Sequence, residues 1–148
     1  MASGDNGGLG SCHRSRSKVR GKGGKRVIGL FKLRIASWNI GSLTGKSIEL
    51  VKYFKRRHIN IARVQETRWV GTKARDVDGF KLWYSGGSKD RNGISILVDE
   101  TLRDYVVEVR RVNDRMMFIK LVVSRHVVNV VSAYAPQVGL DGEVKRLF

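Results

Sequence analysis

The apolar positions of the chain follow two different periods. In residues 33–39 apolar and polar side chains alternate, which is typical of a strand. In residues 46–58 the apolar side chains fall on one face at steps of three and four, which predicts an amphipathic helix. Residues 59–66 are again strand-like. A strand, a helix and a second strand predict two parallel strands, because the helix crossover returns the chain to the edge where it started.

Five further segments are rich in β-branched and aromatic residues, which favour strands. They are residues 80–84, 94–98, 105–109, 116–123 and 127–134. Turn-forming clusters separate these segments, and the single proline, Pro136, ends the last one. One helix and about seven strands predict an α/β domain with a mixed, mostly antiparallel sheet.

The N-terminal segment has a different composition. Residues 1–31 lack an apolar period and are rich in Gly, Ser, Arg and Lys, so we expect a disordered basic tail before a domain at residues 32–148. The basic run at residues 14–26 is typical of phosphate-binding segments, of nuclear addresses and equally of a solvated tail. We expect a nuclear location, with the cytoplasm as the alternative.

Composition excludes several classes of protein. No apolar run approaches the roughly 18 residues of a membrane span, and the N-terminus has no apolar signal core, so we expect neither a membrane protein nor a secreted one. Cys12 is the only cysteine, which excludes an intramolecular disulfide and a Cys-rich zinc module. The 148 residues include 29 Lys and Arg against 13 Asp and Glu, a formal net charge of +16. This charge favours nucleic acid as the partner.

Polar side chains stand where three of the expected strands end. Asn39, Glu66 and Tyr134 occupy these positions, and open α/β sheets place their sites at the carboxyl ends of strands. A carboxylate such as Glu66 is a good ligand for Mg²⁺, which commonly binds one or two carboxylates together with a substrate phosphate. Asn39 and Tyr134 could each donate a hydrogen bond to a phosphate oxygen. Each residue taken alone is more often structural than functional.

Four segments together resemble a known family. They are residues 33–39, 61–67, 92–98 and 132–137. In order and spacing they resemble four motifs of the endonuclease/exonuclease/phosphatase superfamily, across residues 32–148. Residues 65–69, 114–117 and 134–140 further resemble the LINE-type retrotransposon endonuclease branch, and in particular a host protein derived from such an element.

This resemblance implies the N-terminal portion of a two-sheet α/β sandwich that hydrolyses nucleic-acid phosphodiester bonds with Mg²⁺, or with Mn²⁺ in its place. It implies that Glu66 is the metal ligand, that Asn39 is an active-site hydrogen-bonding residue and that Tyr134 positions the phosphate. It also implies that Arg68 and Arg115 contact nucleic acid. For Arg115 the alternative is a turn arginine paired with the neighbouring aspartate.

The sequence departs from the family pattern at its C-terminal end. No Asp-x-Asn motif and no Asp-His pair follow Tyr134, and His58 and His126 are expected at the surface. Members of a catalytic unit act together, so we expect negligible hydrolysis by these 148 residues alone. We also expect the chain to supply mainly the first sheet. The apolar faces of residues 94–98 and 119–123 would then be exposed and would favour self-association.

A second departure lies within the expected strand at residues 59–66. Arg63 stands where the family has a small or apolar residue, and Asn60 stands where it often has Asp. An unpaired buried guanidinium is costly unless its long stem carries the charge to solvent. We therefore expect Arg63 to cost stability, and we interpret both departures as decay of the sequence.

Two other functions remain open at this point. A non-catalytic protein could bind nucleic acid through its charge alone, with an affinity that falls steeply with salt. A phosphoesterase of the same superfamily could act on lipid or inositol phosphates, although the sequence around Glu66 and the basic charge weigh against it.

Overall fold

The computed structural model describes residues 32–88 and 91–135, so the expected tail at residues 1–31 lies outside the described residues. The elements are β1 (Ile35–Asn39), α1 (Ser47–Arg56), β2 (Ile61–Gln65), β3 (Ala74–Val77), β4 (Phe80–Ser85), β5 (Ile94–Val98), the 3-10 helix η1 (Arg103–Tyr105), β6 (Val106–Arg111), β7 (Met116–Val123) and β8 (His126–Ala133). In the described part of the chain, no helix has the length and apolar content needed to cross a bilayer.

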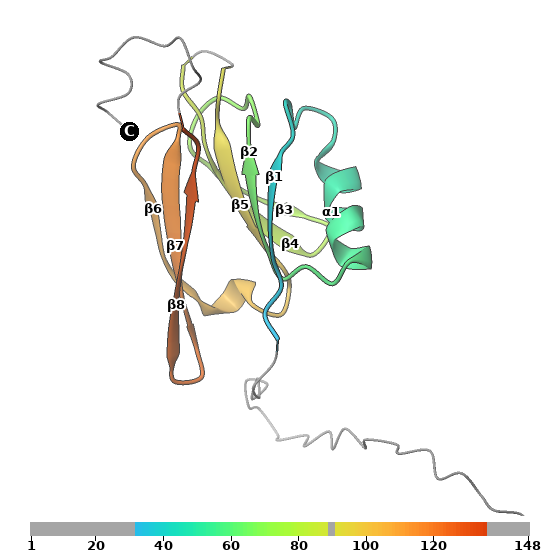
Figure 1. Ribbon diagram of the computed structural model, residues 1–148, viewed down its shortest axis with the longest axis vertical. Helices are drawn as coiled ribbons and strands as arrows, with labels where there is room; N and C mark the ends of the chain where they lie inside the picture. Colours follow the sequence, from blue (N-terminus) through green and yellow to red (C-terminus); the bar gives the residue numbers. More distant parts are fainter. Residues whose placement is uncertain (1–31, 89–90, 136–148) are drawn as a thin grey trace, which may run out of the picture.

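Two sheets stack face to face, and α1 covers the outer face of the larger one (Figure 1). The larger sheet has five strands in the order β1-β2-β5-β4-β3, with β1 and β2 parallel and the other pairs antiparallel. The smaller sheet is antiparallel, in the order β6-β7-β8. The predicted two-sheet α/β sandwich and its parallel opening pair are confirmed.

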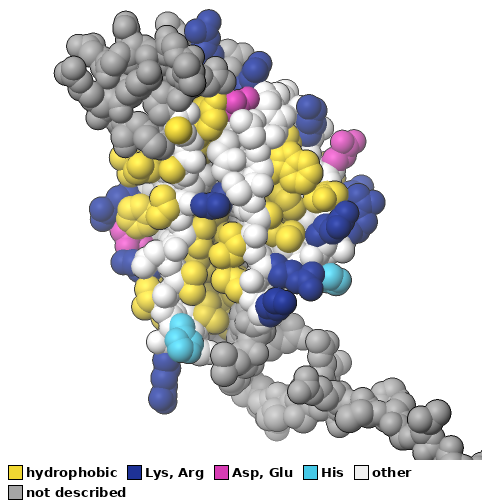
Figure 2. Space-filling model, viewed as in Figure 1, with side chains coloured by type: hydrophobic (Ala, Val, Ile, Leu, Met, Phe, Trp, Pro, Cys, Tyr) yellow, Lys and Arg dark blue, Asp and Glu magenta, His cyan; other side chains and the backbone are white. Residues whose placement is uncertain are grey.

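Helix α1 packs on the five-stranded sheet through three buried side chains, Leu50, Val51 and Phe54. Burial of each large apolar side chain contributes about 1.5–3 kcal/mol. Glu49 lies in the first turn, and Lys55 and Arg56 lie in the last turn, as the helix dipole favours. Lys and Arg side chains accordingly gather over α1 in Figure 2.

The space between the two sheets corrects one of our expectations. We expected the apolar faces of β5 and β7 to be exposed, and this was wrong. Ile96 of β5 and Ile119 of β7 are both 0% exposed and belong to one core cluster. The reason is that the chain itself supplies a second sheet, β6–β8, and the two faces cover each other. Exposed apolar side chains remain on the outer face of the smaller sheet, at Val127 and Val131, and on β1, at Ile35 and Trp38.

Strand β3 is an element that the sequence analysis missed. Its residues are mostly exposed and show no apolar run, because it is an edge strand paired only with β4. The pairing is fixed by a two-residue turn in which Asp78 and Gly79 both have positive φ, 44° and 86°. Asp-Gly is a strong signal for a two-residue hairpin, so the turn was visible in the sequence although the strand was not.

Arg63 links the two sheets. It lies on β2 between Ser37 of β1 and Ile96 of β5. Its Nη1 atom donates a hydrogen bond to the carbonyl of Val131 on β8 at 3.0 Å, whereas its Nε atom is buried without a hydrogen-bond partner among the described residues. The guanidinium thus has a hydrogen bond to the protein, and the expected free-energy cost is limited to one buried N–H.

Candidate active site

Side chains from the ends of three strands meet, and two of them donate to the same oxygen of the third, a carboxylate. Glu66 directly follows β2, Asn39 ends β1, and Tyr134 follows β8. The amide nitrogen Nδ2 of Asn39 donates a hydrogen bond to Glu66 Oε1 at 3.0 Å. The phenol of Tyr134, 68 residues away in sequence, donates to the same oxygen at 2.6 Å. The structure therefore brings together the three residues that the strand ends suggested.

The backbone at Glu66 is held in an unusual conformation. Its φ is +56° and that of Arg68 is +57°, both in the left-handed region. Such conformations cost free energy and persist only where the surroundings enforce them. Here the N–H of Thr67 donates to the carbonyl of Gly93 at 3.1 Å. A Cβ atom on Gly93 would lie 2.5 Å from Thr67 Oγ1, so this close approach requires glycine.

A second glycine anchors the same loop further along. Gly86 forms an isolated bridge with Gly71, and a Cβ atom on Gly86 would lie 1.6 Å from the carbonyl oxygen of Trp69. The Trp69 ring packs edge-on against Tyr84, with 5.0 Å between the ring centroids, and the Arg75 guanidinium carbon lies 4.9 Å from the indole centroid. The loop after Glu66 is thus fixed to β4 by backbone and ring contacts.

The two arginines predicted to contact nucleic acid differ in their position relative to the Glu66 cluster. Arg68 is exposed on the loop just after Glu66. The guanidinium carbon of Arg115 lies 5.3 Å from the centroid of the Tyr134 ring. Arg115 therefore belongs to the cluster around Glu66, while Arg68 lies beside it.

The donor set can be compared with the needs of a divalent cation. The described residues contain no group of three or more His, Cys, Asp and Glu that could hold a metal. The protein oxygens at this point include the Glu66 carboxylate, the Tyr134 phenol and the side-chain oxygen of Asn39, which also accepts the N–H of Gly41. Mg²⁺ keeps several waters and binds one or two carboxylates plus substrate phosphate. The residues fit that mode of binding and do not fit an all-protein cage.

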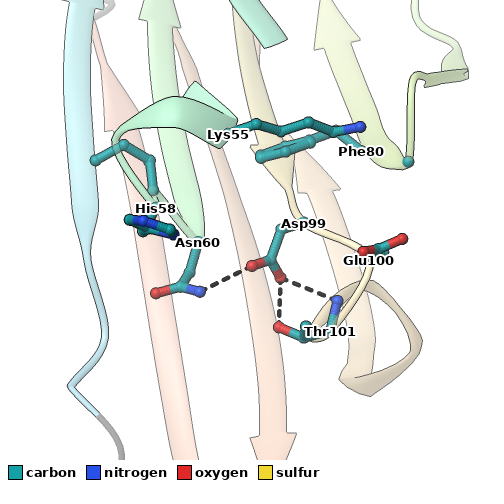
Figure 3. A pocket seen from close by; sticks show the side chains of 9 residues that line it. Lys55, His58, Asn60, Phe80, Asp99, Glu100 and Thr101 are labelled. Atoms are coloured by element: carbon teal, nitrogen blue, oxygen red, sulfur yellow. Dashed lines mark hydrogen bonds between the residues drawn. The ribbon is translucent and has the colours of Figure 1, made fainter. Parts of the chain in front are cut away.

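A cavity of about 370 Å³ lies at the opposite end of the larger sheet (Figure 3). Several of its polar side chains have protein partners. Asn60 Nδ2 donates to Asp99 Oδ2 at 2.8 Å, the Thr101 hydroxyl donates to Asp99 Oδ1 at 2.8 Å, and Lys55 Nζ lies 3.0 Å from Asp78 Oδ2. His58, which the sequence placed at the surface, is exposed at this cavity. We interpret this end of the sheet as structural.

Sequence reasoning missed the residues that support the cluster. Asn92 Oδ1 accepts a hydrogen bond from Arg115 Nη2 at 3.3 Å, and Asn92 Nδ2 donates to Asp114 Oδ2 at 3.2 Å. Asn92 thus lies between Arg115 and Asp114 and links the two side chains through its amide. The sequence marked Asn92 as the first residue of the family-like segment 92–98 and as part of an Asn-Gly pair, which indicates a turn, but it did not indicate these contacts.

Known proteins resemble this chain in sequence. No family model matches the chain. Craniofacial development protein 2 from Bos taurus is 28% identical over 117 residues, and the protein of the same name from Tragulus javanicus is 26% identical over 117 residues. Each alignment covers 77% of this chain, and the chain spans 20% of the length of each relative.

Several solved structures have a similar fold. An AP endonuclease from Archaeoglobus fulgidus matches 71% of this chain and 42% of its own, with a TM-score of 0.54 and 21% identity. The AP endonuclease LMAP from Leishmania major matches 78% and 43%, with a TM-score of 0.58 and 14% identity. A Neisseria 3' phosphatase, NExo, solved with a product DNA hairpin, matches 70% and 42%, with a TM-score of 0.51 and 18% identity.

The fold that the motifs implied is thus confirmed, while membership of the superfamily and of its LINE-type branch stays a prediction. The chain has the endonuclease/exonuclease/phosphatase fold and is similar in sequence to craniofacial development protein 2.

Proposed function

We propose that Glu66, Asn39 and Tyr134 form part of a Mg²⁺-dependent site that binds and hydrolyses a nucleic-acid phosphodiester. The observation that carries this proposal is the convergence of two side-chain donors from separate strands on Glu66 Oε1. A carboxylate oriented in this way at a strand end, beside a strained backbone, is the arrangement expected of a functional site.

Each residue has a distinct task in this proposal. The Glu66 carboxylate holds the cation, and Asn39 orients the carboxylate by donating to it. The Tyr134 phenol donates to a phosphate oxygen, and the charge of Arg115 beside it favours the anionic substrate. When bound, Mg²⁺ polarises the phosphoryl oxygen and neutralises developing charge. Mn²⁺ would serve as a substitute because it accepts the same oxygen ligands.

Binding and hydrolysis are expected to separate in the 148-residue chain. A phosphodiester also requires a group that activates the attacking water, and neither exposed histidine of the described residues lies at Glu66. We propose that these residues hold the cation and the phosphate, and that the 148-residue chain alone hydrolyses DNA negligibly.

A metal titration tests the binding part of this function. The chain is titrated with Mn²⁺ in the presence of a short DNA duplex, and free Mn²⁺ is measured by electron paramagnetic resonance. Glu66→Gln should bind Mn²⁺ at least about tenfold more weakly, because it loses the charged ligand while its amide oxygen can still accept both hydrogen bonds. Asp99→Asn is the matched control and should bind as the wild type does. Equal affinities of wild type and Glu66→Gln would contradict the proposal.

The second candidate is a non-catalytic protein that binds nucleic acid by charge alone, which the net charge of +16 favours. A plasmid-nicking assay with Mg²⁺ separates the two. Nicking that Glu66→Ala abolishes would establish the enzyme and refute our expectation of negligible hydrolysis. DNA binding that falls steeply with salt and is identical in wild type and Glu66→Ala, without Mn²⁺ binding, would favour the second candidate.

A further inference from the structure

Asn92 lies where the turn into β5 crosses the loop that follows Glu66. Its φ is +62°, a left-handed conformation that Asn adopts more readily than most residues. Its carbonyl accepts a hydrogen bond from the N–H of Arg68 at 2.8 Å. The backbone of Asn92 therefore helps to hold the loop beside Glu66 in place.

The side chain of Asn92 makes two hydrogen bonds of opposite sense. Its Oδ1 atom accepts from the guanidinium of Arg115 at 3.3 Å, and its Nδ2 atom donates to the carboxylate of Asp114 at 3.2 Å. Because a guanidinium only donates and a carboxylate only accepts, the orientation of the amide is determined by its partners. A carboxamide meets both requirements at once.

Arg115 in turn contacts the residue that reaches Glu66. Its guanidinium carbon lies 5.3 Å from the Tyr134 ring centroid, within the range of a cation–π contact. Its carbonyl accepts the N–H of Tyr134 at 2.8 Å, and the Tyr134 phenol donates to Glu66 Oε1 at 2.6 Å. A continuous set of contacts thus runs from Asp114 through Asn92, Arg115 and Tyr134 to Glu66.

We propose that Asn92 is a positioning residue for this site, which holds the Arg115 guanidinium on the face of the Tyr134 ring and thereby fixes the phenol that contacts Glu66. The catalytic meaning of this role rests on the proposed function, whereas the contact itself does not. Asn92 acts through Arg115 and is not itself required to touch the substrate. Its two hydrogen bonds select carboxamide chemistry at this position.

The nuclear magnetic resonance signal of the Arg115 Nε–H group tests the proposal. A proton above an aromatic ring is displaced upfield, so this signal, assigned by its loss in Arg115→Lys, should be displaced in the wild type and should return in Tyr134→Leu. Asn92→Gly keeps the left-handed backbone available and removes only the side chain. It should lose most of the upfield displacement while the amide signals of Thr67 and Arg68 stay in place.

A paired exchange gives the rescue. In Asn92→Asp combined with Asp114→Asn, an aspartate accepts from both Arg115 and the new amide, so the displacement should be retained. Asn129→Ala, an exposed asparagine on β8, is the matched control and should change nothing. Retention of the displacement in Asn92→Gly, or its loss in the paired exchange, would overturn the proposal. If Asn92→Gly fails to fold, the paired exchange decides alone. The measurement needs neither metal nor DNA, so its failure is distinguishable from a failure of the proposed function.

Discussion

An asparagine–carboxylate hydrogen bond lies at each end of β2, in different surroundings. At the start of β2, Asn60 Nδ2 donates to the carboxylate of Asp99 at 2.8 Å. At the other end, Asn39 Nδ2 donates to the carboxylate of Glu66 at 3.0 Å. The second oxygen of Asp99 accepts the N–H groups of Thr101 and the following residue, both at 3.1 Å. Glu66 instead receives a second side chain, Tyr134, from the other sheet.

The difference lies in the kind of donor. Asp99 accepts two backbone N–H groups of its own turn, which leads into η1, besides the side chains of Asn60 and Thr101, and such backbone contacts are the usual way in which a carboxylate stabilises a chain reversal. Glu66 is bound by side chains, which can rotate when a cation or a phosphate arrives, and its own φ of +56° shows that the fold holds it there at a cost. The same asparagine–carboxylate pair can therefore serve structure at one end and chemistry at the other.

The largest expected effect concerns the glycines that support each end. Gly86→Ala would place a Cβ atom 1.6 Å from the backbone oxygen of Trp69, which cannot move without shifting the loop after Glu66. We expect a loss of about 3 kcal/mol in the free energy of unfolding. At the opposite end, a Cβ on Gly79 lies 3.5 Å or more from its neighbours. Gly79→Ala should cost about 1–2 kcal/mol for its positive φ alone. Urea unfolding measures both, and equal losses would contradict the asymmetry.

The carboxylates themselves should differ in their effect on stability. Asp99→Ala removes the acceptor of Asn60 and of the turn N–H groups, and should lower the free energy of unfolding by about 2–3 kcal/mol. Glu66→Gln preserves an acceptor for Asn39 and Tyr134 and should cost less than about 1 kcal/mol. Urea midpoints of the two variants, at matched slopes, provide the measurement. A larger loss of unfolding free energy for Glu66→Gln than for Asp99→Ala would indicate that the Glu66 end of β2 is structural as well.

The strands were predictable where apolar and polar positions alternate without interruption. The limits of β5 and β7 match the predicted segments, 94–98 and 116–123, and the ends of β1 and β2 marked Asn39 and Glu66 as neighbours. Strand β3 was not predictable in this way because it is an exposed edge with almost no buried side chains.

Contacts between the two sheets could not be derived from the sequence. Asn92 and Arg115 are 23 residues apart and lie in turns of different sheets, so no period relates them. The same limitation explains the wrong expectation for β5 and β7, since their burial depends on which face the second sheet meets.

The two asparagines give a further contrast. Asn39→Ala should lower the affinity for Mn²⁺ about tenfold, because the Glu66 carboxylate loses a donor that orients it. Asn60→Ala should leave that affinity unchanged and lower stability instead, because it removes a donor from Asp99 and an acceptor from the N–H of Arg34. Mn²⁺ titration gives the affinity of each variant, and urea unfolding gives its free energy of unfolding. A loss of Mn²⁺ affinity in Asn60→Ala would show that the two ends are coupled.

A third carboxylate, on the outer face of the smaller sheet, provides the weakest expected effect. Lys120 Nζ lies 2.9 Å from Glu108 Oε2, and this hydrogen bond and charge, with a smaller effect of Arg110, hold the pKa of Glu108 below its ordinary value of 4.5. Because the pKa is lower in the folded state, the pair stabilises the fold above the unfolded pKa, and this stabilisation is lost as the pH falls through the folded pKa.

Glu108→Gln should therefore lower the melting temperature slightly near pH 7, with the difference vanishing at acid pH and in high salt, because the pair faces solvent and is screened. Melting curves of wild type and variant across pH and salt measure this. The effect of Asp99→Ala should persist in high salt, since it depends on backbone hydrogen bonds within a turn and not on exposed charge. A Glu108→Gln effect that salt leaves unchanged would mean that this carboxylate, like Asp99, stabilises the fold through hydrogen bonds and not through its charge. Glu108 would then no longer serve as the exposed-charge reference for the two carboxylates at the ends of β2.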